Sequence, residues 1–422
     1  MTTLALPLRW QAPLPLRRSA AHKLALAFVW MAVASGAVVF SEPAPVDVLT
    51  MGLIVLLPLI GLVVISRALL GLLAMMLVAA ASAFLAATFA DDIGLATTHT
   101  AVSLYLYLAT FVFAAFVAKN PAKHVQLILG AYTWAAMAAA LGGIAGYFDL
   151  VPGAHELMTR WSRATGFFKD PNVFGPFLIP ALVYALSRLS GAPLRKSLLP
   201  LGVLGVVGFA ILLSFSRGAW FNLAVAVGLF GALHVLTARS NWVRLRFIAL
   251  AVGAVMAAAS VVIVALQFDA VADLLSERAA LTQSYDEGPE GRFGGQEKAV
   301  RLIVDNPLGI GAQQFVPRHH HEEPHNVYLA MFLNAGWLGG LVFLGLTGST
   351  ALLGLRHALA RGAAQPLFLV VYACFVGNAC EGLVIDLDHW RHVYLLMAMV
   401  WGMMASDGAR PHGGPAWSTR GV

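Results

Sequence analysis

The sequence predicts an all-α, polytopic membrane protein with about twelve transmembrane helices and one large helical loop outside the membrane. Three observations predict this fold class. The chain of 422 residues is 59% hydrophobic and only 11% charged, with a mean hydropathy of +0.78, whereas a soluble domain has about 25% charged residues. Apolar runs of about 20 residues, the length that crosses a bilayer, recur along the chain. The polar residues are concentrated in one long segment, residues 268–328.

The apolar runs predict twelve spans. They lie near residues 22–40, 46–66, 68–89, 97–118, 124–148, 173–190, 197–215, 217–237, 243–267, 326–355, 366–386 and 389–406. We expect one transmembrane domain over residues 1–406, with residues 268–325 inserted as a helical loop between the ninth and tenth spans. The polar tail, residues 407–422, is expected to be disordered and cytoplasmic.

The distribution of basic residues predicts the orientation. With the N-terminus inside, 17 of the 27 Lys and Arg residues fall on inside segments, as the positive-inside rule requires. An even number of spans then places both termini in the cytoplasm. The long polar segment is therefore expected outside the cytoplasm.

Several classes of protein are excluded by what the sequence lacks. It has two cysteines, Cys374 and Cys380, in one apolar run, too few for a disulfide scaffold or a zinc site. No basic tract alternates with aromatic residues, so we expect no nucleic-acid partner. Neither a P-loop nor a Gly-x-Ser-x-Gly elbow is present, which removes support for nucleotide hydrolysis and for a serine nucleophile. No cofactor is expected.

The long polar segment has its own predicted structure. Apolar residues at helical spacing predict a helix from Phe268 that lies on the bilayer surface. A second helix is predicted over residues 292–305, ended by Asn306-Pro307. Gly309 and Gly311 let the chain turn back, so that His325 stands where the tenth span begins.

Two arginines are candidates for binding an anion. Arg217, in SFSRGAW, stands between two apolar runs, where a charge is costly unless it is interfacial or paired. Arg292 follows Gly-Pro-Glu-Gly at a predicted helix start, where a basic residue is mildly unfavourable. The planar guanidinium fits phosphate oxygens and stays charged. The alternatives are an interfacial anchor for Arg217 and a solvated surface charge for Arg292.

His325 is the candidate proton acceptor, because imidazole titrates near neutral pH; the alternative is an interfacial polar residue. The run from His319 to His325 also raises the question of a metal site. Adjacent histidines in a loop seldom all reach one ion, and the His-Glu-x-x-His zinc pattern is absent. We therefore expect no metal.

Five further residues are assigned to substrate binding. Lys169 and Asn172 lie in FFKDPNVFG, where Asp-Pro-Asn indicates a turn first and a binding role second. Arg301 lies on the second loop helix, Asn326 follows His325, and Arg391 lies in DLDHWRHVY beside the last span. Within the spans, Glu381 is expected to pair or to line a cavity, and Gly336 to allow close helix packing.

These motifs together resemble the O-antigen ligases and the related O-antigen polymerases of Gram-negative inner membranes. The resemblance covers about residues 165–405. It rests on Phe-Lys-Asp-Pro-Asn at 168–172, Ser-Arg-Gly at 216–218, Gly-Arg at 291–292, Asn-Pro-Leu-Gly-Ile-Gly at 306–311, Pro-His-Asn-Val-Tyr-Leu at 324–329 and Trp-Arg at 390–391.

The resemblance implies a GT-C-like glycosyltransferase that acts without a metal on the periplasmic face of the inner membrane. Its donor would be O-antigen polysaccharide on undecaprenyl diphosphate, and its acceptor a sugar hydroxyl of lipid A–core. Arg217 and Arg292 would hold the diphosphate, and His325 would act on the acceptor hydroxyl. We expect a monomer surrounded by membrane lipids.

Two alternatives stay open at this point. A polymerase would use the same donor with a second lipid-linked glycan as acceptor, and the motifs do not separate the two. A transporter would also suit twelve spans, but transporters place polar groups near the bilayer midplane on broken helices. Here the ionisable groups gather at the predicted outer face, which favours the enzyme.

Overall fold

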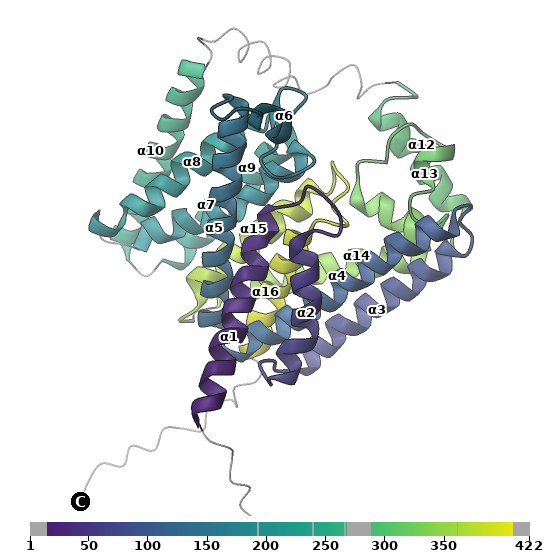
Figure 1. Cartoon of the computed structure of the whole chain (residues 1–422), viewed down its shortest axis with the longest axis horizontal. Coiled ribbons are helices and arrows are strands. Elements are labelled where there is room, and N and C mark those ends of the chain that lie inside the picture. The colour runs from purple at the N-terminus through teal and green to yellow at the C-terminus, as the bar shows by residue number, and fades with distance from the viewer. Residues whose placement is uncertain are drawn as a thin grey trace, which may run out of the picture.

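The computed structural model describes residues 15–191, 194–238, 240–265, 267, 288–360 and 362–407. Over these residues the chain is a bundle of helices (Figure 1), with one hairpin of two short strands, β1 (Thr159–Arg160) and β2 (Arg163–Ala164). The all-α prediction is confirmed. The predicted surface helix from Phe268 and the predicted disordered tail beyond residue 407 lie outside the described residues.

Each of the twelve predicted spans overlaps one α-helix of the described chain. These helices are α1 (Pro15–Ala34), α2 (Pro45–Leu59), α3 (Arg67–Ala87), α4 (Ile93–Lys119), α5 (Pro121–Tyr147), α7 (Pro171–Gly191), α8 (Leu198–Leu213), α9 (Arg217–Thr237), α10 (Asn241–Ala265), α14 (Val327–Leu359), α15 (Gln365–Glu381) and α16 (Arg391–Asp407). Seven helices in the described part of the chain are long and apolar enough to cross a membrane, and α2, α8 and α15 are shorter apolar helices. A multi-pass membrane protein is confirmed, whereas the count of twelve spans stays a prediction.

The predicted second loop helix is confirmed as α12 (Arg292–Asp305). Its buried side includes Ala299, which packs with Leu302 and Ile303. The remaining short elements are η1 (Ser35–Ala37), α6 (Ala154–Met158), η2 (Leu194–Lys196) and α13 (Phe315–Arg318).

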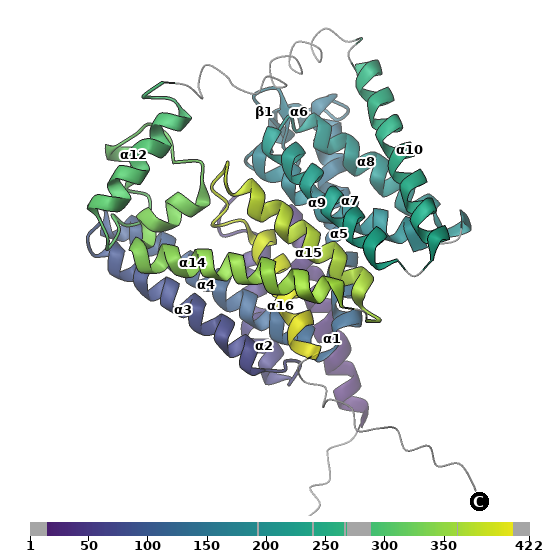
Figure 2. The same ribbon diagram turned by 180° about the vertical axis from the view of Figure 1, so that it is seen from behind.

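The long helices pack side by side in the bundle, with α4 against α16, α3 against α14, α9 against α15 and α7 against α8. α12 and α13 lie beyond the ends of α3 and α14 in both views (Figures 1 and 2). The Gln314 side chain, which accepts hydrogen bonds from the backbone of Asp91 and Asp92, ties them there. We call this the α12 end of the bundle. α4, α7, α9, α14 and α16 begin at this end, and α5 and α15 finish at it.

The turn after α12 packs closely on α14. Gly309 has a φ of +85° and Gly336, inside α14, has a φ of +64°, a region that favours glycine. A Cβ on Gly336 would stand 2.6 Å from the backbone carbon of Leu308. Gly336 therefore packs closely against the 306–311 turn and so fixes α12 relative to α14. The close helix packing expected of this stretch is seen beside it, where Ser82 on α3 donates a hydrogen bond to the Ala335 carbonyl oxygen.

Candidate active site

His325 stands immediately before α14 in a strained backbone conformation. Its φ is +49°, a region that costs a non-glycine residue about 1–3 kcal/mol unless the surroundings hold it. Asn326 caps the helix, because its side chain accepts hydrogen bonds from the backbone of Tyr328 and Leu329. The Asn326 side chain thus has a local structural role beside its predicted role in binding.

Two segments far apart in sequence hold the His325 backbone. Asp386, in the loop between α15 and α16, accepts hydrogen bonds from the backbone N–H groups of His325 (2.9 Å) and Asn326 (3.0 Å). Arg292, the first residue of α12, places Nη2 3.5 Å from the His325 carbonyl oxygen. The fold therefore brings two of the three predicted catalytic residues, Arg292 and His325, together.

The surroundings favour a neutral His325 imidazole. Burial lowers its pKa first, and the Arg292 charge lowers it further, while Glu322 and Asp170 raise it by less. The imidazole Nε2 lies 3.2 Å from Glu322 Oε2. A neutral imidazole that donates from Nε2 to Glu322 has its lone pair on Nδ1, so it can accept a proton there.

Two carboxyl groups near His325, those of Asp386 and Glu323, have pKa values raised to near neutral. Burial, followed by the charges of Asp388 and Glu323, raises the pKa of Asp386 to about 7. Burial and the Asp388 charge raise the pKa of Glu323 to about 7. Because these groups repel one another, the ionisation of Asp386 depends on the state of its neighbours.

The helix that Arg217 begins, α9, packs on the end of α15, which in turn contacts the start of α14 beside His325. Arg217 is the half-buried first residue of α9, whose N-cap Ser216 accepts a hydrogen bond from the backbone of Ala219. The next residue, Gly218, lies so close to Glu381 that a Cβ would stand 2.7 Å from Glu381 Oε1. Glu381 is followed by Gly382, whose carbonyl oxygen accepts a hydrogen bond from the backbone of Val327, at the start of α14. The Ser-Arg-Gly motif therefore lies at the same end of the bundle as His325.

Glu381 is fully buried, and its Oε2 accepts a hydrogen bond of 2.7 Å from Asn222 Nδ2 on α9. The prediction that this carboxyl has a polar partner inside the bundle is confirmed. Glycine at position 218 is explained by the same contact, because a larger residue would displace the Glu381 carboxyl from α9.

A buried arginine that the sequence did not single out connects two of the motifs. Arg163 donates from Nε to the carbonyl oxygen of Ser214 and from Nη2 to Asn172 Oδ1, each at 2.7 Å. Asp170 Oδ1 accepts from the backbone of Asn172, which confirms the predicted turn. The neighbouring Lys169 pairs with Glu42 at 3.6 Å. The turn at 169–172 is thus tied to the chain just before α9.

The other two predicted binding residues have ionic partners on the protein. Arg391 makes a two-pronged ion pair with buried Asp47, with nitrogen–oxygen distances of 2.6 and 2.8 Å, which joins α16 to α2. Arg301 pairs with Glu297 on the exposed side of α12, where its side chain is 74% exposed. Substrate binding by these two residues stays a prediction.

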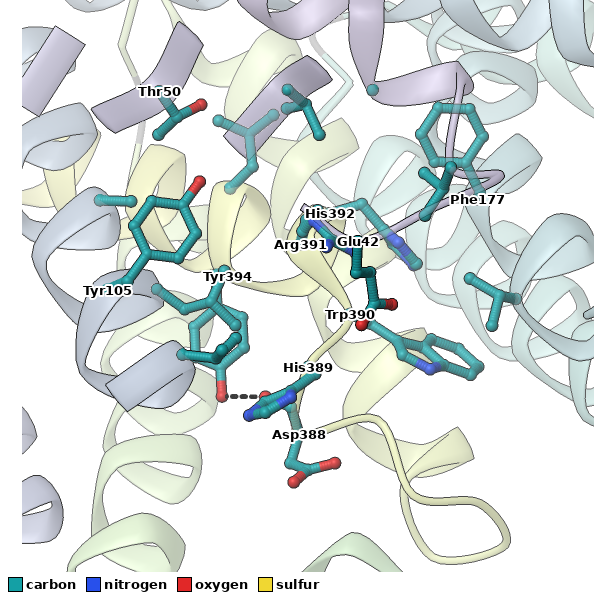
Figure 3. A pocket seen from close by; sticks show the side chains of 18 of the residues that line it. Glu42, Thr50, Tyr105, Phe177, Asp388, His389, Trp390, Arg391, His392 and Tyr394 are labelled. Atoms are coloured by element: carbon teal, nitrogen blue, oxygen red, sulfur yellow. Dashed lines mark hydrogen bonds between the residues drawn. The ribbon is translucent and has the colours of Figure 1, made fainter. Parts of the chain in front are cut away.

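A cavity of about 570 Å³ lies beside the loop between α15 and α16, which contributes Asp386, Asp388, His389 and Trp390 to its lining. Figure 3 shows side chains that line it, including Glu42, Tyr105, Asp388 and Arg391. Its walls come from α1, α2, α4, α5, α7 and α16, and they include Lys169, Asp170 and Asp386. Asp386 therefore contacts both His325 and the cavity.

Two clusters in the described part of the chain have side-chain types that bind metals. They are His99, Asp388 and His389, and Glu290, His320 and His321, each with ligand atoms within 4.8 Å of one another. In the first cluster the imidazoles are stacked with centroids 3.9 Å apart, and their Nε2 atoms lie near Ser103 Oγ for His389 (2.9 Å) and Asp388 Oδ2 for His99 (3.4 Å). In the second, Lys298 lies 2.9 Å from Glu290 Oε1 and occupies that carboxylate. The expectation that the protein uses no metal stays a prediction.

A search among curated proteins found no match to this chain. Residues 202–344 match the family model Wzy_C, described as O-antigen ligase. The matched segment runs from α8 into α14 and contains Arg217, Arg292 and His325, the three residues that the motifs single out. The match agrees with the family that the motifs predict, and it covers about a third of the chain.

Proposed function

We propose that the protein is an O-antigen ligase of the bacterial inner membrane. It transfers O-antigen polysaccharide from undecaprenyl diphosphate to a sugar hydroxyl of lipid A–core on the periplasmic face. The match to the Wzy_C family model over residues 202–344 supports a ligase or polymerase type of glycosyl transfer in general. The observation that carries the proposal is the placement of Arg292 against the backbone of His325, with Nη2 3.5 Å from its carbonyl oxygen.

In the proposed reaction, His325 removes the proton from the acceptor hydroxyl. The hydroxyl oxygen attacks the anomeric carbon, a new glycosidic bond forms, and the bond between that carbon and the diphosphate oxygen breaks. The diphosphate leaves with the electron pair, and the anomeric centre is inverted. General-base catalysis of this kind contributes about 100-fold or more.

Arg217 and Arg292 stabilise the leaving group. As the glycosidic bond breaks, negative charge accumulates on the diphosphate, and fixed guanidiniums in a poorly solvated place offset it. The loss of one such donor costs about 3 kcal/mol in comparable sites. Two guanidiniums supply this term without a metal ion, which is why we propose a metal-independent reaction.

Lys169, Asn172, Arg301, Asn326 and Arg391 are proposed to bind the substrates. Lys169 and Arg391 line the same cavity as Asp386, which accepts a hydrogen bond from the His325 backbone. Asn172 is held by Arg163, and Asn326 caps α14, so substitution of either one is expected to disturb the site through the backbone as well.

The test is reconstitution of the purified chain with lipid-diphosphate-linked O-antigen and one of two acceptors. Transfer to lipid A–core, seen as a shift on a gel, supports the ligase. Transfer only to a second lipid-diphosphate-linked glycan identifies a polymerase instead. Transfer to neither acceptor, with glycolipid flux across proteoliposomes, contradicts both and favours transport.

A further inference from the structure

We propose that the 570 Å³ cavity binds the acceptor, a lipid-anchored glycan, with one hydrocarbon chain in its depth and sugar hydroxyls at its mouth. The proposal rests on the proposed function, because it assigns the second substrate of that reaction to a place. It follows from the shape of the cavity, the charges at its mouth and its position relative to His325.

The cavity is long and its depth is apolar. One face of α4 lines it from Leu95 to Phe113 at helical spacing, a distance of about 27 Å along the helix. The deep hydroxyls already have partners: Thr110 donates to the Leu106 carbonyl oxygen and Tyr132 to that of Phe177. A sugar placed there would leave its hydroxyls unpaired, at a cost of about 1–3 kcal/mol each, whereas a hydrocarbon chain would not.

The mouth is acidic. The cavity is lined there by Glu42, Asp170, Asp386 and Asp388. Its two basic lining residues are engaged with carboxylates, Lys169 with Glu42 at 3.6 Å and Arg391 with Asp47 at 2.6 Å. Carboxylates accept hydrogen bonds from sugar hydroxyls and repel a diphosphate. The mouth therefore suits a hydroxyl-bearing head group and disfavours the lipid diphosphate of the donor.

His325 lies between this mouth and the first arginine of α12. Asp386 lines the cavity and accepts a hydrogen bond from the His325 backbone, while Arg292 reaches the carbonyl oxygen of the same residue. An acceptor hydroxyl at the mouth and a diphosphate beside Arg292 would thus lie near two different backbone groups of His325, its N–H and its C=O. A direct displacement requires both substrates to be bound at once, with the acceptor hydroxyl and the donor diphosphate in separate places near the catalytic base.

Two pairs of variants on α4 test the assignment in the purified full chain. Ala109→Phe fills the depth of the cavity, and Ala101→Phe makes the same change at an exposed position of the same helix. Thr98→Trp narrows the mouth, and Thr97→Trp is its neighbour outside the cavity lining. The KM for the acceptor glycolipid and the KM for the lipid-diphosphate donor are measured separately.

We expect both cavity variants to raise the KM for the acceptor about tenfold or more, equivalent to about 1.4 kcal/mol, and to leave the KM for the donor unchanged. Both controls should keep the two wild-type values. A rise in the donor KM instead, or an unchanged acceptor KM in both cavity variants, would overturn the assignment.

Direct binding separates a failure of this assignment from a failure of the proposed function. A glycolipid with a fluorescent acyl chain is titrated against all four variants, each checked for folding by its Tm. Binding that is lost only in folded Ala109→Phe and Thr98→Trp supports the cavity even where wild-type protein transfers no glycan. Equal binding to all four refutes the cavity assignment even where wild-type protein transfers glycan normally.

Discussion

Asp386→Asn is the substitution that most sharply tests how His325 is held. The wild-type carboxylate accepts the backbone N–H groups of His325 and Asn326 with its two oxygens, at 2.9 and 3.0 Å. Asparagine keeps one acceptor oxygen but turns an NH₂ group toward the other N–H. Loss of one charge-assisted hydrogen bond costs about 2 kcal/mol. The backbone of His325, strained at a φ of +49°, would then tend to move to a more relaxed conformation.

If the loss of about 2 kcal/mol moves the imidazole out of its catalytic position and so raises the activation free energy by that amount, kcat should fall about 30-fold. The KM values of both substrates should stay nearly unchanged. The assay is glycan transfer by purified protein, with gel separation of products. Asp305→Asn, the same change at an exposed carboxylate that ends α12, is the control and should keep wild-type kcat.

The pH profile gives a second readout of the same prediction. Because the pKa of Asp386 is raised to about 7, wild-type transfer should decline as pH falls below about 7 and the carboxylate becomes protonated. In Asp386→Asn this decline in transfer near pH 7 should be absent. A decline should remain only below pH 6.5, where His325 becomes protonated, because burial and Arg292 lower its pKa. Wild-type kcat with an unchanged pH profile in Asp386→Asn would refute the reasoning.

The stability contribution of Asp386 should fall as pH rises, whereas transfer should fall as pH decreases. The folded-state pKa of Asp386 is raised from 3.8 to about 7, so the folded state favours the protonated carboxyl. Its contribution to the free energy of unfolding is complete below about pH 3.8 and is lost as pH rises through about 7. The Tm of Asp386→Asn minus that of wild type should therefore be more positive at pH 8 than at pH 5.

Three further predictions concern the frame and the chemistry. Arg391→Ala should lower stability by about 3–5 kcal/mol, because it leaves the buried Asp47 carboxylate without its ionic partner, and Asp47→Ala should cost less, because the Arg391 side chain is 24% exposed; an unchanged Tm in Arg391→Ala would instead point to a role in substrate binding alone. Gly336→Ala should lower Tm and transfer together, because its Cβ would meet the Leu308 backbone at 2.6 Å, and normal folding would contradict the described turn. A chelator such as EDTA should leave the transfer rate of purified protein unchanged, and a loss that Zn²⁺ or Mg²⁺ restores would show that the reaction uses a metal.

The sequence predicted the helices well because their signals are local. Apolar runs of the right length, Gly291 before α12 and Asn306-Pro307 after it determine where helices begin and end. The pairing of Arg292 with His325 was reached through their motifs and their common place in one polar segment. Membrane helices show their existence in composition, but composition does not show which neighbour each one meets.

The parts that were missed depend on contacts between distant segments. Arg163 reads as one more charge in an amphipathic stretch, yet its guanidinium is buried between Ser214 and Asn172. Asp386 lies 61 residues from His325 in sequence, so no spacing rule connects them. Arg391 was assigned to substrate from its place beside the last span, whereas its partner, Asp47, lies 344 residues away.

The most direct test of the central claim is the affinity of the purified protein for undecaprenyl diphosphate without sugar. It is measured for wild type and for Arg217→Ala, Arg292→Ala and His325→Ala, with transfer rates from the same preparations. We expect both arginine variants to bind the diphosphate at least about tenfold more weakly, by about 1.4 kcal/mol or more, and His325→Ala to bind it normally while transferring nothing. Wild-type affinity in both arginine variants, or normal transfer by His325→Ala, would contradict the division of roles between the guanidiniums and the imidazole.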